Sequence, residues 1–167
     1  MNYSPQHNDV KMKGIYFSLI AIGLSLNLAG SGVVKTILSS LSLILLSTGL
    51  FLFIKHGMTT YTYIAMENGN RIDFYINRTV GKRGAYVCYY PLSDLVAAEK
   101  YEKGIKSKVK EEHGKVFFYN YCHNLFSKEK QILVFQNDGY CDAVIVELSQ
   151  ECFKYVQDAY KKEWVVQ

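Results

Sequence analysis

The sequence predicts a membrane-anchored protein, in which a two-helix transmembrane hairpin precedes a mainly β domain that ends in a single helix. Three observations lead to this prediction. Two long stretches without charge, 14–34 and 36–54, lie near the N-terminus. The periodicity then changes from helical to alternating between residues 59 and 148. Beyond that region, apolar residues recur at helical spacing over 150–162.

Composition limits the alternatives. The chain has 167 residues, which suits one domain with a modest extension, and a net charge of +4. The two prolines and the many β-branched and aromatic residues exclude a disordered or collagen-like protein. The small net charge gives no support to nucleic-acid binding. We therefore expect no nucleic-acid partner.

The two uncharged stretches are each long enough to cross a bilayer, whose hydrocarbon core of about 30 Å needs roughly 20 apolar residues. The second stretch is the stronger candidate because it is rich in leucine. The first is interrupted by Asn27 and by the small-residue run 29–32, which is the natural turn. A turn at 29–32 would leave a short first helix, which requires bilayer thinning or snorkelling by Lys35. A buried helical hairpin of a soluble protein is the alternative.

Lysines at the ends of the spans predict the orientation. Lys11, Lys13 and Lys55 lie on one side and Lys35 alone on the other, so both termini are expected in the cytoplasm. A cleaved signal peptide containing the apolar run 15–28 is the competing interpretation. The second stretch would still deliver the C-terminal region to the cytoplasm, so we expect an inner-membrane protein of bacterial type in either case.

This interpretation divides the chain into three parts. They are a cytoplasmic tail (1–13), a transmembrane hairpin (14–56) and a cytoplasmic β domain (57–167). Small residues also recur on one face of the first span and are expected to pack against the second span. They are Gly14, Ser18, Ala21, Ser25 and Ala29.

The alternating region predicts about seven short antiparallel strands followed by a helix. The strands are expected over 59–67, 71–77, 85–90, 92–96, 116–122, 131–136 and 142–148. The lysine-rich segment 100–115 is interpreted as a long, solvated and partly helical loop. Ser149 is the expected N-cap of the helix over 150–162.

The order of these elements resembles the pleckstrin-homology-like (PH-like) domains of bacterial membrane proteins, including an uncharacterised group in which a two-span hairpin precedes the domain. The resemblance covers 59 to about 162. It rests on the motifs Asp73–Ile76, Gly81–Arg83, Tyr90–Leu95, Tyr119–Cys122 and Ala143–Ser149. It implies a seven-stranded orthogonal β-sandwich, or partly open barrel, with a C-terminal capping helix. It also implies a binding or scaffolding module, without naming a ligand.

Basic residues are the candidate binding sites. One group flanks the turn after the second predicted strand and consists of Arg78, Lys82 and Arg83. The other lies in the lysine-rich loop and consists of Lys106, Lys108 and Lys110. Lysines near an anionic leaflet attract it, but neighbouring glutamates cancel part of that field. The usual basic pattern of the family lies in the preceding hairpin, where this chain has 67–71, and an ordinary solvated turn is the plainer alternative.

No catalytic or metal-binding pattern is visible. The four cysteines form no CxxC pair and are expected to be free thiols in the cytoplasm. We therefore predict no enzyme activity, no metal and no cofactor. The first functional hypothesis is a membrane-anchored module for a protein partner or for self-assembly. The alternative is binding of anionic lipid head groups, and a subunit of a membrane enzyme or transporter is the third.

Overall fold

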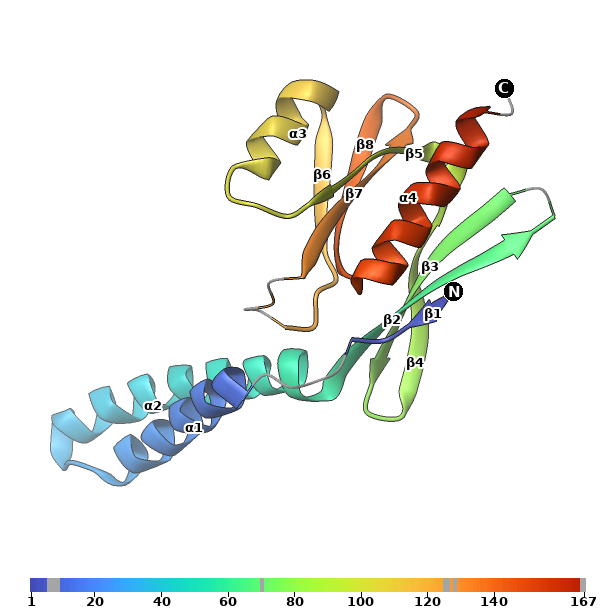
Figure 1. Ribbon diagram of the computed structural model, residues 1–167. Helices are drawn as coiled ribbons and strands as arrows, with labels where there is room; N and C mark the ends of the chain where they lie inside the picture. Colours follow the sequence, from blue (N-terminus) through green and yellow to red (C-terminus); the bar gives the residue numbers. More distant parts are fainter. Residues whose placement is uncertain (6–9, 70, 125–126, 128, 166–167) are drawn as a thin grey trace. The chain divides into compact units, whose positions relative to one another are not determined.

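The computed structural model describes residues 1–5, 10–69, 71–124, 127 and 129–165, with side chains described as far as residue 160. The chain divides into two compact units. The helical unit comprises His7–Thr59, and the β domain combines Met1–Gln6 with Thr60–Gln167. The first residues of the chain therefore belong to the β domain (Figure 1).

The helical unit consists of two helices that pack against each other. Helix α1 spans Val10–Leu28 and helix α2 spans Gly32–Phe53. Gly30 (φ +84°) adopts a left-handed conformation in the turn between them, which a residue with a Cβ would rarely do. A short π-helical turn, Ile54–Met58, continues α2 to the first strand of the sheet that follows.

The seam between α1 and α2 is built around two glycines. The buried hydroxyl of Ser42 donates a hydrogen bond of 2.7 Å to the carbonyl oxygen of Gly23. A Cβ placed on Gly49 would lie 2.9 Å from Cγ1 of Ile20 and 3.3 Å from the carbonyl oxygen of Tyr16. The helices therefore touch closely where side chains are absent.

The stripe of small residues predicted for this contact is wrong. All five members, Gly14, Ser18, Ala21, Ser25 and Ala29, are exposed. The buried residues of α1 are Met12, Tyr16 and Gly23 instead. The hydroxyl of Ser25 donates to the Ala21 carbonyl one turn back, at 2.9 Å, so its hydrogen bond is satisfied within the helix.

One helix among the described residues is long and apolar enough to cross a membrane, in place of the two predicted. This helix is α2 with its π-helical extension, Gly32–Met58, with a mean hydropathy of 2.3. Its apolar window is 11% buried, so most of its apolar surface is exposed in the structure. Helix α1 includes Lys11 and Lys13 in its first turn and Asn27 near its end, which lowers its hydropathy.

The β domain contains two four-stranded sheets (Figure 1). Sheet A contains, in spatial order, β1 (Asn2–Tyr3), β2 (Thr59–Asn68), β3 (Arg71–Val80) and β4 (Arg83–Pro91). Sheet B contains, in spatial order, β5 (Leu95–Lys100), β7 (Lys130–Asn137), β8 (Tyr140–Glu147) and β6 (Val116–Asn120). A single 3₁₀ turn, Leu92–Asp94, leads from β4 into β5.

The two sheets and helix α4 (Gln150–Val165) share one hydrophobic core. The rings of Phe74 and Phe135, from opposite sheets, stack with centroids 6.4 Å apart, and Tyr90 stacks on Phe135 at 4.4 Å. Val156 contributes the α4 side of the core and is fully buried. The expected architecture of packed sheets with a C-terminal helix is therefore present.

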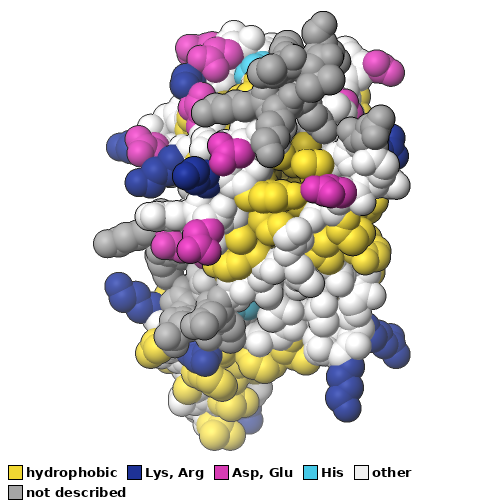
Figure 2. All heavy atoms as spheres, turned by 45° about the vertical axis from the view of Figure 1, so that its right-hand side comes forward, with side chains coloured by type: hydrophobic (Ala, Val, Ile, Leu, Met, Phe, Trp, Pro, Cys, Tyr) yellow, Lys and Arg dark blue, Asp and Glu magenta, His cyan; other side chains and the backbone are white. Residues whose placement is uncertain are grey.

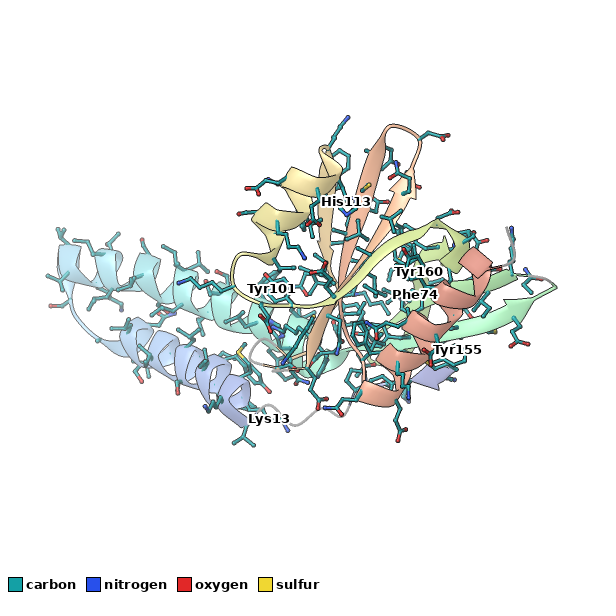
Figure 3. All side chains as sticks on the ribbon, turned by 45° about the horizontal axis from the view of Figure 1, so that its top comes forward. Lys13, Phe74, Tyr101, His113, Tyr155 and Tyr160 are labelled. Carbon is teal, nitrogen blue, oxygen red and sulfur yellow. The ribbon has the colours of Figure 1, made fainter. Side chains whose placement is uncertain are left out.

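Helix α4 begins as predicted and covers one edge of sheet B. The hydroxyl of Ser149 accepts a hydrogen bond of 3.2 Å from the backbone N–H of Cys152, which confirms the N-cap. The amide of Gln157 donates to the Ala98 carbonyl at 3.2 Å. Tyr160, labelled in Figure 3, comes from the same helix, and its side chain reaches β5. These contacts cover the outer edge of β5.

The lysine-rich segment 100–115 contains a helix, α3 (Ile105–His113), which agrees with the expected partly helical segment, and most of its residues are exposed. Ile105 and Val109 are separated by one helical turn and are both buried against sheet B. The six lysines of this segment make its composition typical of a solvated segment, so the apolar pair was not recognised as part of the core. The face of sheet B that is turned away from sheet A is thus covered by α3.

The prediction of uniformly antiparallel strands is also wrong, because β6 pairs with β8 in parallel. Strands β7 and β8 contain the continuous apolar runs 132–135 and 143–146, which are buried on both faces. Such strands belong in the centre of a sheet. The half-exposed β6 therefore lies at the edge, beside β8, although β7 follows it in the sequence.

Candidate binding surfaces

The cations predicted around the second strand connection do lie together. Arg83 pairs with Val80 at the end of the β3–β4 hairpin, and Gly81 (φ +60°) makes the turn. Arg78, Lys82 and Arg83 are all exposed. Within the described part of the chain, none of the three forms a salt bridge. We call these three residues the basic turn.

The basic turn lies at the end of sheet A where β2 begins. Strands β2 and β3 are neighbours in the sheet and are joined by a tight turn at Gly69 (φ +65°). The last residues of β3 therefore lie beside the first residues of β2. Because Thr59 directly follows the π-helical turn, this end of the sheet is the one from which the chain passes into α2.

The structure separates the three lysines predicted in the second group. Lys108 forms salt bridges with Glu99 at 2.7 Å and with Glu112 at 3.9 Å. The ammonium groups of Lys106 and Lys110 lie over the ring of Phe118 in β6, 5.4 and 5.8 Å from its centroid. Helix α3 thus turns two of its lysines toward β6, whereas acidic neighbours neutralise the third.

The two predicted basic groups do not form one surface. In Figure 1, α3 lies at the top of the β domain and the β3–β4 turn at its bottom. Figure 2 shows basic and acidic side chains interspersed over the upper half of the face that it displays, with hydrophobic side chains gathered in the middle. A ligand that contacts the basic turn therefore does not contact the α3 lysines as well.

The edge of sheet B formed by β6 is a further exposed surface that was not predicted from the sequence. Phe117 and Tyr119 are 45% and 39% exposed, and Phe117 packs against Tyr140 with ring centroids 5.4 Å apart. Lys115 lies over the Phe117 ring, 5.6 Å from its centroid. The sequence predicted a strand over 116–122 but not its position in the sheet. The signal that identifies its aromatic residues as a surface is the edge position of β6, which the sequence alone does not reveal.

A polar group lies inside the sandwich. The hydroxyl of Tyr90 and the amide of Asn137 both donate to Oδ2 of Asp142, at 3.0 and 2.9 Å. Burial, followed by the charge of Asp142, raises the pKa of Tyr90 far above its ordinary value. Burial also raises the pKa of the Cys88 thiol to about 12. The Tyr90 hydroxyl and the Cys88 thiol are therefore protonated at neutral pH, which makes the thiol a poor nucleophile.

A buried carboxylate organises the loop after β6. Glu147 is 3% exposed, and its Oε2 accepts the backbone N–H groups of His123 at 2.8 Å and Asn124 at 2.9 Å. Its Oε1 accepts the side-chain amide of Asn124 at 3.0 Å. A pocket of about 400 Å³ lies beside it, lined in part by Tyr3 and Glu129. The carboxylate is occupied by these hydrogen bonds, so it holds the loop in place.

The cysteines are free thiols in this structure. Burial raises the pKa of Cys122, like that of Cys88, to about 12. Among the residues that the structure describes, no three His, Cys, Asp or Glu side chains lie close enough together to hold a metal ion.

Comparison with protein-family models, with curated proteins and with solved structures found no match to this chain.

Proposed function

We propose that this protein is a membrane-anchored binding module. In this proposal, α1 and α2 cross the bilayer as a hairpin, and the β domain binds a protein partner or a second copy on the cytoplasmic side. The observation that carries the proposal is the pairing of β1 with β2 in sheet A. The binding role is supported by the exposed surfaces described above.

The pairing limits how often the chain can cross a membrane. Tyr3 pairs with Tyr63, and Asn2 with Ile64, so residues on both sides of the helical unit belong to one sheet. A sheet lies on one side of a bilayer. The chain must therefore cross an even number of times between Tyr3 and Thr59. If α2 crosses, α1 must cross as well.

Helix α1 can make that crossing with local adjustment. Its uncharged part, from Gly14 to Leu28, spans about 22 Å at 1.5 Å per residue. This is shorter than a hydrocarbon core of about 30 Å, and the difference is met by bilayer thinning and by snorkelling of Lys13 and Lys35. Cleavage of the first segment as a signal peptide would remove β1 from sheet A, which argues against that alternative.

The PH-like classification also remains part of the proposal. Two packed sheets with a C-terminal helix in their common core support it. The parallel pairing of β6 with β8, the helix α3 and the additional strand β1 depart from the seven-stranded antiparallel pattern.

The proposal is tested by topology reporters on the full chain, fused after Gln167 and inserted at Gly32. We expect cytoplasmic activity after Gln167 and external activity at Gly32, given the positions of Lys11, Lys13 and Lys55. Reporters on opposite sides with Gln167 outside would reverse the orientation. Both reporters inside would exclude the hairpin.

A second candidate function is binding of anionic lipid head groups by the basic turn. The observation that favours it is the position of the turn at the end of sheet A from which the chain enters α2. Covalent continuity keeps this end within a few residues' reach of the membrane, where lysines and arginines attract anionic lipid.

The test compares the full chain in vesicles with and without phosphatidylglycerol by hydrogen exchange of 78–86. We expect slower exchange in the anionic vesicles, lost when Arg78, Lys82 and Arg83 are replaced by glutamine. A control variant with Lys100→Gln, Lys103→Gln and Lys154→Gln removes the same charge from exposed positions elsewhere. Equal exchange in both vesicle types would rule out this function for the turn.

A further inference from the structure

We propose that β6 binds an extended acidic segment of a protein partner as an added strand of sheet B. The surface, which we call the β6 edge, consists of the backbone of Val116–Asn120 and the side chains that flank it. These are Lys106, Lys110, Lys115, Phe117, Phe118 and Tyr119. The inference rests on the proposed binding function and names its partner by chemistry.

The backbone of β6 has one side available for pairing. The N–H of Tyr121 donates to the Ile145 carbonyl at 3.0 Å, and the Lys115 carbonyl accepts the N–H of Cys141 at 2.9 Å. In a parallel ladder, both groups of a residue point the same way and alternate along the strand. The N–H and C=O groups of Val116, Phe118 and Asn120 therefore point away from β8. A strand that pairs there would satisfy them.

The opposite edge of sheet B does not offer this. The carbonyls of Ala98 and Val96 in β5 accept hydrogen bonds from Gln157 and Tyr160 of α4, at 3.2 and 3.3 Å. Helix α4 thus covers β5. In the described part of the chain, no side chain of another element donates such a hydrogen bond to the outward carbonyls of β6. An exposed edge with aromatic side chains is uncommon in a protein that only has to stay soluble.

The charges around β6 select the partner. Lys106 and Lys110 come from α3 and Lys115 from the segment before β6, and all three lie over aromatic rings of the strand. None of them forms a salt bridge within the residues described, unlike Lys108. A second copy would bring three lysines against three lysines and is disfavoured. An acidic strand meets complementary charge.

Aromatic side chains supply the apolar part of the contact. Phe117 and Tyr119 lie on one face of β6, and Phe118 on the other with its two lysines. A strand of alternating acidic and apolar residues therefore fits, because its acidic face reaches Lys106 and Lys110 beside Phe118 while its apolar face extends the Phe117–Tyr119 surface. Lys115 lies over the Phe117 ring and adds positive charge at the start of the strand.

The experiment uses the full ¹⁵N-labelled chain in nanodiscs of zwitterionic lipid and an octapeptide of alternating glutamate and valine. We expect the peptide to slow hydrogen exchange at the amides of Phe118 and Asn120 more than at those of Phe117 and Tyr119, which already face β8. The same peptide N-methylated at every residue keeps its charge but has no backbone N–H to donate on either edge, and a lysine–valine peptide reverses the charge. Neither should give protection.

A triple variant tests the charge. Lys106→Gln, Lys110→Gln and Lys115→Gln together should weaken peptide binding about tenfold, as expected for three exposed charge pairs. The triple variant with Lys100→Gln, Lys103→Gln and Lys154→Gln loses the same charge away from β6 and should bind normally. Amide spectra of both variants report whether the fold is intact.

Several results would overturn the inference. Absence of binding by the glutamate–valine peptide would do so, as would equal binding of its N-methylated form. Protection of the same amides by anionic vesicles and not by the peptide would identify a membrane as the occupant. In each case the topology test still decides the proposed function separately. Reporters that exclude the hairpin would remove the anchor while leaving a positive peptide result intact.

Discussion

The close packing of α1 against α2 at Gly49 predicts opposite effects for the same substitution at two glycines. Gly14 and Gly49 both lie within helices, so alanine at either position gains about 0.5–1 kcal/mol of intrinsic helix stability. A Cβ at Gly14 meets nothing within 4 Å. Gly14→Ala should therefore stabilise the helical unit, or leave its stability unchanged.

At Gly49 the added carbon meets three different groups. It would lie 2.9 Å from Cγ1 of Ile20, 3.3 Å from Cβ of Leu19 and 3.3 Å from the backbone oxygen of Tyr16. A backbone atom cannot rotate away, so the helices must separate. Such overpacking costs about 1–3 kcal/mol, which exceeds the gain in helix propensity. We expect Gly49→Ala to destabilise the helix pair by about 1 kcal/mol.

The assay is unfolding of the full chain in mixed micelles by titration with dodecyl sulfate, followed by circular dichroism at the helix band. The midpoint for Gly49→Ala should fall below that of the original chain, and the midpoint for Gly14→Ala should not. Equal shifts of both variants in the same direction would refute the packing argument, because intrinsic helix propensity alone would then explain them.

Three further predictions concern the β domain. The pKa values of Cys88 and Cys122 are raised to about 12. In the folded chain at pH 8, these two thiols should therefore react with iodoacetamide about a thousandfold more slowly than ordinary thiols with a pKa of 9. In denaturant they should react at normal rates, and mass spectrometry of the labelled peptides measures both rates. Burial raises the pKa values of these two thiols and of Tyr121, so these groups ionise at lower pH in the unfolded chain than in the folded chain. The stability that their protonated forms contribute should therefore be complete below pH 9 and lost as the pH rises toward 12. Thermal unfolding across that range should show the melting temperature falling. Glu147→Gln should lower the free energy of unfolding by about 2 kcal/mol, because one of the three donors on the carboxylate loses its acceptor. A change below about 0.5 kcal/mol in chemical denaturation would contradict the role of Glu147 in holding the loop after β6.

Local patterns in the sequence were sufficient for much of the β domain. Alternation and turn residues located most strands, and the cap at Ser149 was predicted because its hydrogen bond is local. The basic turn was found for the same reason, since Arg78 and Arg83 flank a hairpin closed by Gly81. Features that depend on residues about three positions apart, such as the Ser149 cap and the Val80–Arg83 turn, can therefore be predicted from the sequence.

The errors concern contacts between distant segments. The parallel position of β6 is decided by the competition of β7 and β8 for the centre of sheet B, and no local pattern in 116–120 records it. The segment around Ile105 and Val109 was expected to be partly helical, but the burial of this pair against sheet B is a contact with distant strands that was not predicted. The strand β1 is only two residues long, so its sequence could not predict pairing with Tyr63 and Ile64.

That short strand gives the proposed topology its physical basis. The orientation predicted from lysines near the spans depends on the energies of a few individual charges. Helix α1 on its own is also a weak candidate for a span because it is short. Pairing between β1 and β2 adds a constraint that does not depend on hydropathy, since a state with α2 alone across the bilayer would place Tyr3 and Tyr63 on opposite sides and break sheet A at that edge. In the proposed topology, the folding of the β domain would therefore favour insertion of α1, because the pairing of β1 with β2 would then be kept.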